Sequence, residues 1–319
     1  MLRGVDGKDR RRLRPHRAIR GAAAALIDWE RSFEKALAAG DPLAASDALR
    51  RTGTRGWVKK AEYSRAAAIV RSQSASAFVR RDWATRLLQH PRRVDKVLAA
   101  VILRPLIATH RADVERAVHR LARDEDWEVR ESAASLLGDA LERDFSVYLA
   151  PARAWVAGGD PRLRRAVIVA AKYAARSRHP ERAELILDLI EPALADHDEY
   201  VRRSLGPYAI GDQLLRSYAD ATFTRLERWA RDPDENIRWN VASAFTSASG
   251  ADVAERAFGM LAFLASDTRP FVTRAVGAAV RNILTRRPEL RDDIAAWDGG
   301  QRAVVQRALD TSGAAPVGS

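Results

Sequence analysis

Residues 124–141 read DEDWEVRESAASLLGDAL, and residues 160–175 read DPRLRRAVIVAAKYAA. Both stretches open with an acidic turn, an apolar residue and an arginine, and both continue with apolar residues at the spacing of one helix face. The phrase recurs along the rest of the chain, with Thr273 in place of the arginine in its last copy, and the steps between its apolar positions are 34, 38, 36 and 35 residues. These positions are Val129, Leu163, Val201, Ile237 and Val272.

This period predicts the fold class. Repeats of this length that hold two helices each are typical of HEAT-like repeats, which form an all-α fold, the α-solenoid superhelix. One helix pair cannot bury its apolar face alone, so neighbouring pairs must stack. We expect an aspartate before each phrase to cap the following helix, and the arginine to bond across the next turn or repeat. These aspartates are Asp124, Asp160, Asp196, Asp232 and Asp267.

The domain organisation follows from where the repeats begin and end. The chain has 319 residues, which suits two ordinary domains or one long solenoid, and the unbroken repeats favour the solenoid. Within it, one helix is expected to run from Glu199 to Arg216. The predicted parts are a disordered basic arm (1–20), an N-terminal helical cap (21–89), a HEAT-like repeat solenoid (90–310) and a disordered tail (311–319).

Charge and composition narrow the function. Lysine and arginine number 54 against 42 acidic residues, a net charge of +12, and such a surplus favours a polyanionic partner, most commonly a nucleic acid. The chain has no cysteine, which excludes disulfides and thiolate metal sites, and no histidine pair has metal-ligand spacing. We therefore expect no metal and no cofactor. We also expect no membrane segment and no secretory leader, hence a cytoplasmic protein, and a monomer.

One position in each repeat lies directly after the arginine of the phrase. Equivalent positions on successive inner helices of a solenoid line up along one concave surface. A cationic row there suits a phosphodiester backbone and predicts salt-dependent binding of double-stranded DNA. The alternative is a solvated helix face whose charges pair between repeats. The row consists of Glu131, Arg165, Arg203, Trp239 and Arg274.

Trp127 and Glu131 are candidate catalytic residues. They are four residues apart and therefore share one helix face. A carboxylate can stabilise the oxocarbenium character that a sugar develops when its N-glycosidic bond breaks, and an aromatic face attracts a cationic leaving group. The alternative is structural, with Trp127 as a hydrophobic staple and Glu131 paired with an arginine.

Three patches of this sequence resemble the AlkC/AlkD-type DNA alkylation-repeat glycosylases. They are WEVRE at 127–131, LRRAVIVAAKY at 163–173 and EYVRRSLG at 199–206, and their order and spacing also agree with the family. The resemblance covers roughly residues 90–285. It implies excision of N3- or N7-alkylated purines from DNA, with Trp127 lining the lesion nucleotide, Glu131 replacing the usual aspartate, and Arg165 holding a backbone phosphate.

The sequence departs from the family pattern after Gly206. Pro207 stands where AlkD-like members place a second tryptophan, and Tyr208 or Trp239 would have to supply that wall of the cleft. The hypothesis is therefore a DNA glycosylase for cationic alkylpurines. Two alternatives stay open: a non-catalytic DNA-shape binder of the same family, and a HEAT-repeat scaffold for protein interactions.

Overall fold

The computed structural model describes residues 29–54, 57–297 and 302–312. The predicted basic arm (1–20) and residues 313–319 of the predicted tail lie outside this described part. Where the chain is described, its regular structure is helical, with one isolated bridge between Thr54 and Trp57. The chain divides into two compact units, Met1–Ile102 (unit 1) and Leu103–Ser319 (unit 2).

Unit 1 is a small group of helices with its own apolar core. A helix over residues 29–38 precedes α2 (Pro42–Arg50), α3 (Lys60–Ser72), α4 (Ala77–Gln89) and α5 (Arg93–Leu103), whose last residue begins unit 2. Phe33, Leu49 and Leu87 are fully buried in this core. Asp95 is also fully buried, and it is satisfied by hydrogen bonds from Ser46 and from Arg92 Nε, the latter at 2.7 Å.

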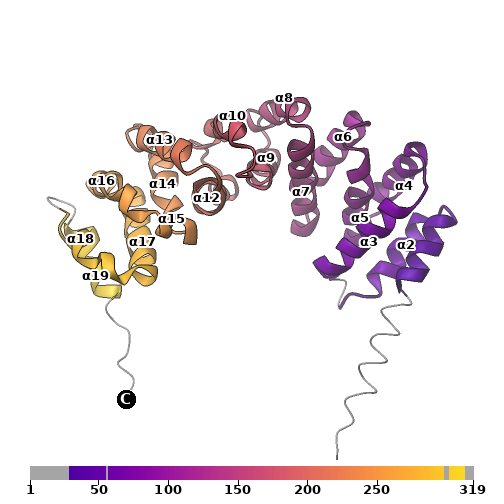
Figure 1. Ribbon diagram of the computed structural model, residues 1–319, viewed down its shortest axis with the longest axis horizontal. Helices are drawn as coiled ribbons and strands as arrows, with labels where there is room; N and C mark the ends of the chain where they lie inside the picture. The colour runs from indigo at the N-terminus through magenta and orange to yellow at the C-terminus, as the bar shows by residue number, and fades with distance from the viewer. Residues whose placement is uncertain (1–28, 55–56, 298–301, 313–319) are drawn as a thin grey trace, which may run out of the picture. The chain divides into compact units, whose positions relative to one another are not determined.

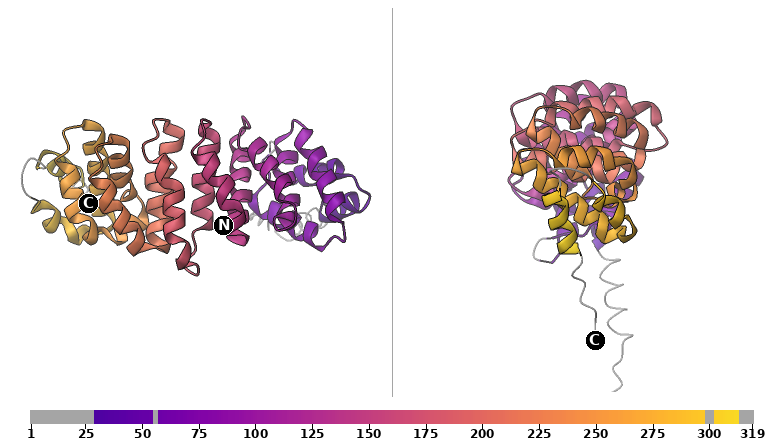
Figure 2. Two further views of the ribbon diagram at one scale, coloured as in Figure 1. Left: turned by 90° about the horizontal axis from the view of Figure 1, so that it is seen from above. Right: turned by 90° about the vertical axis from the view of Figure 1, so that its left-hand side faces the viewer.

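Unit 2 consists of stacked helix pairs, which can be followed in Figure 1 and from above in Figure 2. One layer contains the first helices of the pairs: α6 (Arg111–Leu121), α8 (Phe145–Val156), α10 (Ala183–Ile190), α13 (Ala219–Ala230) and α16 (Ala254–Ala265). The second layer contains α7 (Trp127–Arg143), α9 (Pro161–Ala174), η4 (Leu205–Leu214), α14 (Glu235–Ala244) and α17 (Pro270–Arg286), each packed against the next. The predicted all-α solenoid of helix pairs is confirmed.

Short helices connect and end these pairs. The connecting elements are η1 (Arg104–Leu106), η2 (Pro180–Arg182), η3 (Glu191–Ala193), α11 (Glu199–Arg202), α12 (Leu215–Ser217) and α15 (Ala248–Asp252). The unit ends with η5 (Pro288–Leu290), α18 (Arg291–Ala295) and α19 (Arg302–Ser312), and α19 packs against α17. In the described part of the chain, no helix is both long enough and apolar enough to cross a bilayer.

The helix caps differ from the sequence prediction by two residues. In α7 the cap is Asp126, which accepts from Glu128 N at 2.8 Å, while Asp124 accepts from Asp126 N at 2.9 Å. The same double turn occurs at Asp196-x-Asp198 and Asp232-x-Asp234. The first aspartate of each turn is therefore no cap, and only Asp160 caps its helix directly. The sequence pattern identified the correct turn, but in these three turns the second aspartate caps the helix and not the first.

Two of the five predicted aspartates, Asp196 and Asp267, accept from the arginine of the phrase in the preceding repeat. Arg164 Nε donates to Asp196 Oδ2 at 2.5 Å, and Arg238 donates to Asp267 Oδ2 at 2.8 Å. Each of these pairs joins the arginine of one repeat to the turn of the next. These arginines therefore hold the stack together, as expected from the phrase.

The expected single helix over 199–216 is wrong. After α11 and a short turn, Leu205–Leu214 wind as a π-helix, in which Ala209 N donates to Ser204 O at 3.2 Å. Pro207 has no N–H to offer an α-helical hydrogen bond, which favours a change of winding here. Gly206 lets η4 approach α14 closely, because an added Cβ would lie 2.7 Å from Asn240 O.

Candidate functional site

Glu131 lies on the second turn of α7, and its carboxylate is held by two donors from α9. Arg165 Nη2 donates to Oε2 at 3.1 Å, and the Tyr173 hydroxyl donates to Oε1. The Glu131 side chain is 28% exposed and that of Arg165 is 16% exposed. The carboxylate is thus fixed in orientation on a side chain that is partly exposed.

A second set of contacts extends this cluster toward η4. The hydroxyls of Tyr173 and Tyr208 are 3.3 Å apart. Lys172 Nζ lies 3.2 Å from the centroid of the Tyr208 ring and 2.7 Å from Asp212 Oδ2, and the lysine is buried. The cation holds the ring by a cation–π contact. Tyr208 therefore has a fixed place next to the residues that orient Glu131.

Tyr200 supports the cluster from the other side. Arg130 Nε donates to its hydroxyl at 2.8 Å, and the Arg165 guanidinium lies 4.8 Å from the centroid of its ring. Arg165 is therefore positioned by an aromatic ring as well as by a carboxylate. A planar guanidinium carries five N–H donors, so these contacts leave donors for a further oxygen ligand.

Burial raises the pKa of Tyr173, and its hydrogen bond to Glu131 raises that pKa further. A proton on Tyr173 satisfies the carboxylate, whereas a phenolate beside it would be repelled. Tyr173 therefore remains a neutral donor to Glu131 at pH values where an ordinary tyrosine loses its proton.

Trp127 is the first residue of α7 and is 58% exposed. It precedes Glu131 by one helical turn, as the sequence predicted, and both lie on the same helix. A large exposed indole at this end of α7 offers apolar contact surface to a ligand that approaches it.

The other predicted residues lie on later repeats and have separate neighbours. Arg203 is exposed and forms an ion pair with Glu199 at 2.6 Å. Trp239 stacks on Phe271, with ring centroids 5.7 Å apart and an interplanar angle of 12°. Arg274 is exposed on α17 and lines a hollow with residues of α19. The structure thus gathers Glu131, Arg165 and Tyr208 into one cluster and leaves Arg203, Trp239 and Arg274 outside it.

The sequence reasoning missed Tyr173, Tyr200 and Lys172. Tyr173 follows Arg165 by eight residues, which is a same-face spacing on a helix, so this tyrosine could have been placed beside its arginine. Tyr200 and Lys172 gave no such signal, because their partners come from other repeats.

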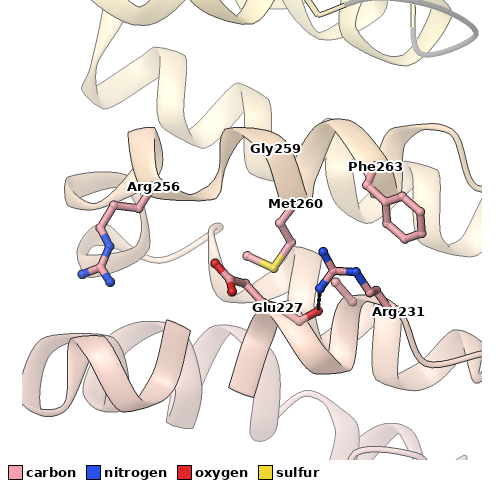
Figure 3. Close-up of a pocket in the computed structure, with 7 residues that line it drawn as sticks. Glu227, Arg231, Arg256, Gly259, Met260 and Phe263 are labelled. Carbon is pink, nitrogen blue, oxygen red and sulfur yellow. Dashed lines mark hydrogen bonds between the residues drawn. The ribbon is translucent and has the colours of Figure 1, made fainter. Parts of the chain in front are cut away.

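A different hollow, of about 300 Å³, lies between α13 and α16 (Figure 3). Its cations are already engaged: Arg231 donates to the Glu227 carbonyl oxygen at 3.0 Å, and Arg256 donates to Asp220 at 2.9 Å. Phe263, on its rim, is partly exposed. We therefore favour the Glu131 cluster as the candidate site.

The segment that contains the Glu131 cluster is similar to a known protein family. A model of a protein family, described as DNA alkylation repair enzyme, covers this part of the sequence. Residues 58–208 match this family. The resemblance expected from the sequence is thereby confirmed, over residues 58–208 rather than the expected 90–285, and this matched segment contains Trp127, Glu131, Arg165 and Tyr208.

Two further comparisons concern curated proteins and solved structures. No curated protein matches the chain. Among solved structures, a designed armadillo repeat protein is 15% identical, with a TM-score of 0.28, and the match covers 63% of this chain and 98% of that one. An engineered protein is 13% identical, with a TM-score of 0.24, over 74% of this chain and 99% of that one.

Proposed function

We propose that this protein binds double-stranded DNA and hydrolyses the N-glycosidic bond of purines alkylated at N3 or N7. The observation that carries the proposal is the Glu131 carboxylate, which is oriented by Arg165 and Tyr173 inside the segment that matches the family, one helical turn from an exposed Trp127. A carboxylate held in this way can act on charge that develops on a sugar.

The proposed reaction needs no general acid from the protein to protonate the leaving base. An alkylated purine is already cationic, so it can leave with the electron pair of the C1′–N bond without prior protonation. Glu131 then stabilises the positive charge at C1′, and a water molecule adds there and loses a proton. The Trp127 ring offers a face that attracts the cationic base, and Arg165 keeps donors for a backbone phosphate.

A second candidate function is DNA binding without catalysis. The ion pair of Arg165 with Glu131 supports it, because a paired carboxylate offers less charge to a sugar cation. Pro207 at the position of the family's second tryptophan supports it as well. Both candidates predict DNA binding, and they differ in whether a base is released.

The test is the release of 3-methyladenine and 7-methylguanine from a methylated duplex in single-turnover reactions. The Glu131→Gln variant is expected to lose about 10²–10³-fold in rate, the usual effect of removing an electrostatic stabiliser, and to keep its DNA affinity. Glu227→Gln is the matched control, because Glu227 is exposed on α13 and its substitution removes the same charge.

Two results would count against the enzyme. If the wild type binds the duplex but releases no base above the spontaneous rate, the non-catalytic candidate replaces it. If Glu131→Gln releases bases as fast as the wild type, the reaction does not depend on this carboxylate.

A further inference from the structure

Lys172 is a buried cation that the proposed reaction does not use. It lies on α9, directly before Tyr173. A buried ammonium group costs free energy unless polar or charged partners surround it, so its partners show where its charge acts. Both partners belong to η4: Nζ lies 3.2 Å from the centroid of the Tyr208 ring and 2.7 Å from Asp212 Oδ2. Lys172 therefore joins α9 to the next inner helix.

The two contacts of Lys172 fix the position of the Tyr208 ring. Tyr208 and Asp212 are four residues apart on η4, which is close to one helical turn. The face of an aromatic ring attracts a cation, and the Asp212 carboxylate compensates the buried charge. The ring is held in this way while its hydroxyl lies 3.3 Å from the hydroxyl of Tyr173.

The hydroxyl groups of the two tyrosines form a chain that ends at Glu131. A hydroxyl has one proton to donate. The Tyr173 proton is donated to Glu131 Oε1, so between the two tyrosines Tyr208 is the donor and the Tyr173 oxygen is the acceptor. A hydroxyl that accepts a hydrogen bond donates more strongly itself. Tyr208 therefore acts on the carboxylate through Tyr173.

The contact between the tyrosines is sensitive to the position of Tyr208. Its 3.3 Å exceeds the usual length of an O–H···O bond, so a small displacement of the ring would break it. Tyr173 has less freedom, because its stem lies on the backbone of α7. A Cβ added to Gly138 would lie 2.7 Å from Tyr173 Cβ, which is closer than two carbon atoms pack. The chain thus depends on what holds Tyr208.

We propose that Lys172 is a positioning residue for Glu131. It holds Tyr208 so that Tyr208 donates to Tyr173, which in turn donates to the carboxylate. The inference rests on the proposed function where it concerns base release, and on the contacts alone where it concerns the carboxylate. Arg165 donates to the other carboxylate oxygen, so the tyrosine chain and the arginine orient Glu131 from separate contacts.

The test compares Lys172→Met and Tyr208→Phe, alone and combined, in the full chain. Methionine keeps an unbranched side chain without the charge, and phenylalanine keeps the ring without the hydroxyl. Each single variant is expected to slow the single-turnover release of a methylated base about three- to tenfold, the effect of one neutral hydrogen bond. The double variant should be no slower than the slower single variant, because both changes act through the same hydroxyl.

The carboxylate is also observed without any reaction. In protein with ¹³C-labelled glutamate side chains, the carboxyl signal of Glu131 is the one that disappears in Glu131→Gln. Its chemical shift is expected to change in Lys172→Met and in Tyr208→Phe, and the double variant should add nothing to the larger of the two changes. A lysine that only stabilises the fold would change the melting temperature and leave this signal in place.

Asp212→Asn is a second way to loosen Lys172. The Asp212 side chain is 40% exposed, so this substitution removes a partner of the lysine without a cavity in the core. It should shift the Glu131 signal in the same direction as Lys172→Met. Lys35→Met is the matched control, because Lys35 is exposed in unit 1 and its loss removes the same charge. It should keep the wild-type signal and rate.

The inference is overturned if Lys172→Met and Asp212→Asn leave the Glu131 signal unchanged, or if their effects add in full to that of Tyr208→Phe. Suppose that the wild type releases no base, while the Glu131 signal responds to Lys172 only when Tyr208 has its hydroxyl. The enzyme proposal then fails and the inference stands. If bases are released and the Glu131 signal is the same in every Lys172 and Tyr208 variant, the inference alone fails.

Discussion

At the scale of the residue, the orientation of Glu131 depends on side chains from a neighbouring repeat. The sequence predicted Glu131, Arg165 and Tyr208 as site residues, and the structure places them in one cluster. The spacing can place Tyr173 beside Arg165 on one helix, but it does not give the hydrogen bond from Tyr173 to Glu131, because that pair is 42 residues apart and meets only when α7 and α9 stack. Side chains that act within one helix are visible from spacing, whereas those that act between helices are not.

Tyr173→Phe removes one of the two donors to Glu131. The rate of base release is expected to fall about ten- to a hundredfold, which corresponds to the ~1.5–3 kcal/mol of a hydrogen bond to a charged group. The measurement is the single-turnover rate, with DNA affinity recorded in parallel. Tyr208→Phe is the comparison, because its hydroxyl contacts Tyr173 at 3.3 Å and not Glu131, and it should cost less. An equal reduction of the rate in both variants would contradict a specific contribution of the Tyr173 hydrogen bond to Glu131.

At the scale of the element, the repeat period located the helix pairs correctly but did not give their ends or their winding. Pro207 could have suggested a break in the expected helix over 199–216, since it lacks an N–H donor. The π-helix that results also depends on α14, whose Asn240 accepts from Gly206 N at 2.9 Å. Local sequence therefore indicated a disturbance, and tertiary packing decided its form.

Gly206→Ala and Gly277→Ala are expected to change the free energy of unfolding in opposite directions. At Gly206 the new methyl group would lie 2.7 Å from Asn240 O and 2.9 Å from Ser243 Cβ, so η4 and α14 must separate. The free energy of unfolding should fall by about 1–3 kcal/mol, as is typical of overpacking. At Gly277 the methyl group has room, and the higher helix propensity of alanine should raise the free energy of unfolding by roughly 0.5–1 kcal/mol. Urea denaturation measures both, and a stabilised Gly206→Ala variant would contradict the close packing.

Asp267→Ala should weaken the junction between the last two repeats. The buried Asp267 carboxylate accepts from Arg238, from the Arg269 side chain and from Arg269 N, and these partners hold its pKa well below the usual range. Its removal leaves those donors unmatched, so we expect a cost of about 2–4 kcal/mol in urea denaturation. Asp252→Ala, which removes an exposed carboxylate, is the control. The stabilisation from Asp267 is present above the pKa of an unfolded aspartate and should disappear as the pH falls through the lower, folded value.

At the scale of the whole molecule, the net charge of +12 suggested a polyanionic partner before any residue was placed. The structure divides the surplus into arginines that pair between repeats and arginines that gather in the hollow of α17 and α19. Composition alone could not separate these two groups, because it does not record which side chains meet when the repeats stack. Only the neighbours of each arginine in the structure identify those that pair between repeats.

The folded state should lose stability at alkaline pH. Tyr148 is fully buried, its hydroxyl donates to Ile107 O at 2.7 Å, and burial raises its pKa to about 12. An unfolded tyrosine titrates near pH ~10, so between these values the unfolded chain loses a proton that the folded chain keeps. The free energy of unfolding therefore falls as the pH rises through this window. Urea denaturation at several pH values should show a shallower fall in Tyr148→Phe, and an unchanged slope would contradict the assignment.

The double aspartate turn has a consequence for how such a chain can change its length. Where Arg164 meets Asp196, the carboxylate that receives an arginine from the preceding repeat belongs to the same turn whose Asp198 caps the next helix. A helix pair built in this way carries both halves of the joint. A duplicated pair would thus arrive with a matching connector at each end and could be accepted within the stack. Growth by whole units, in steps of about 35 residues, would then lengthen the molecule without redesigning any existing junction.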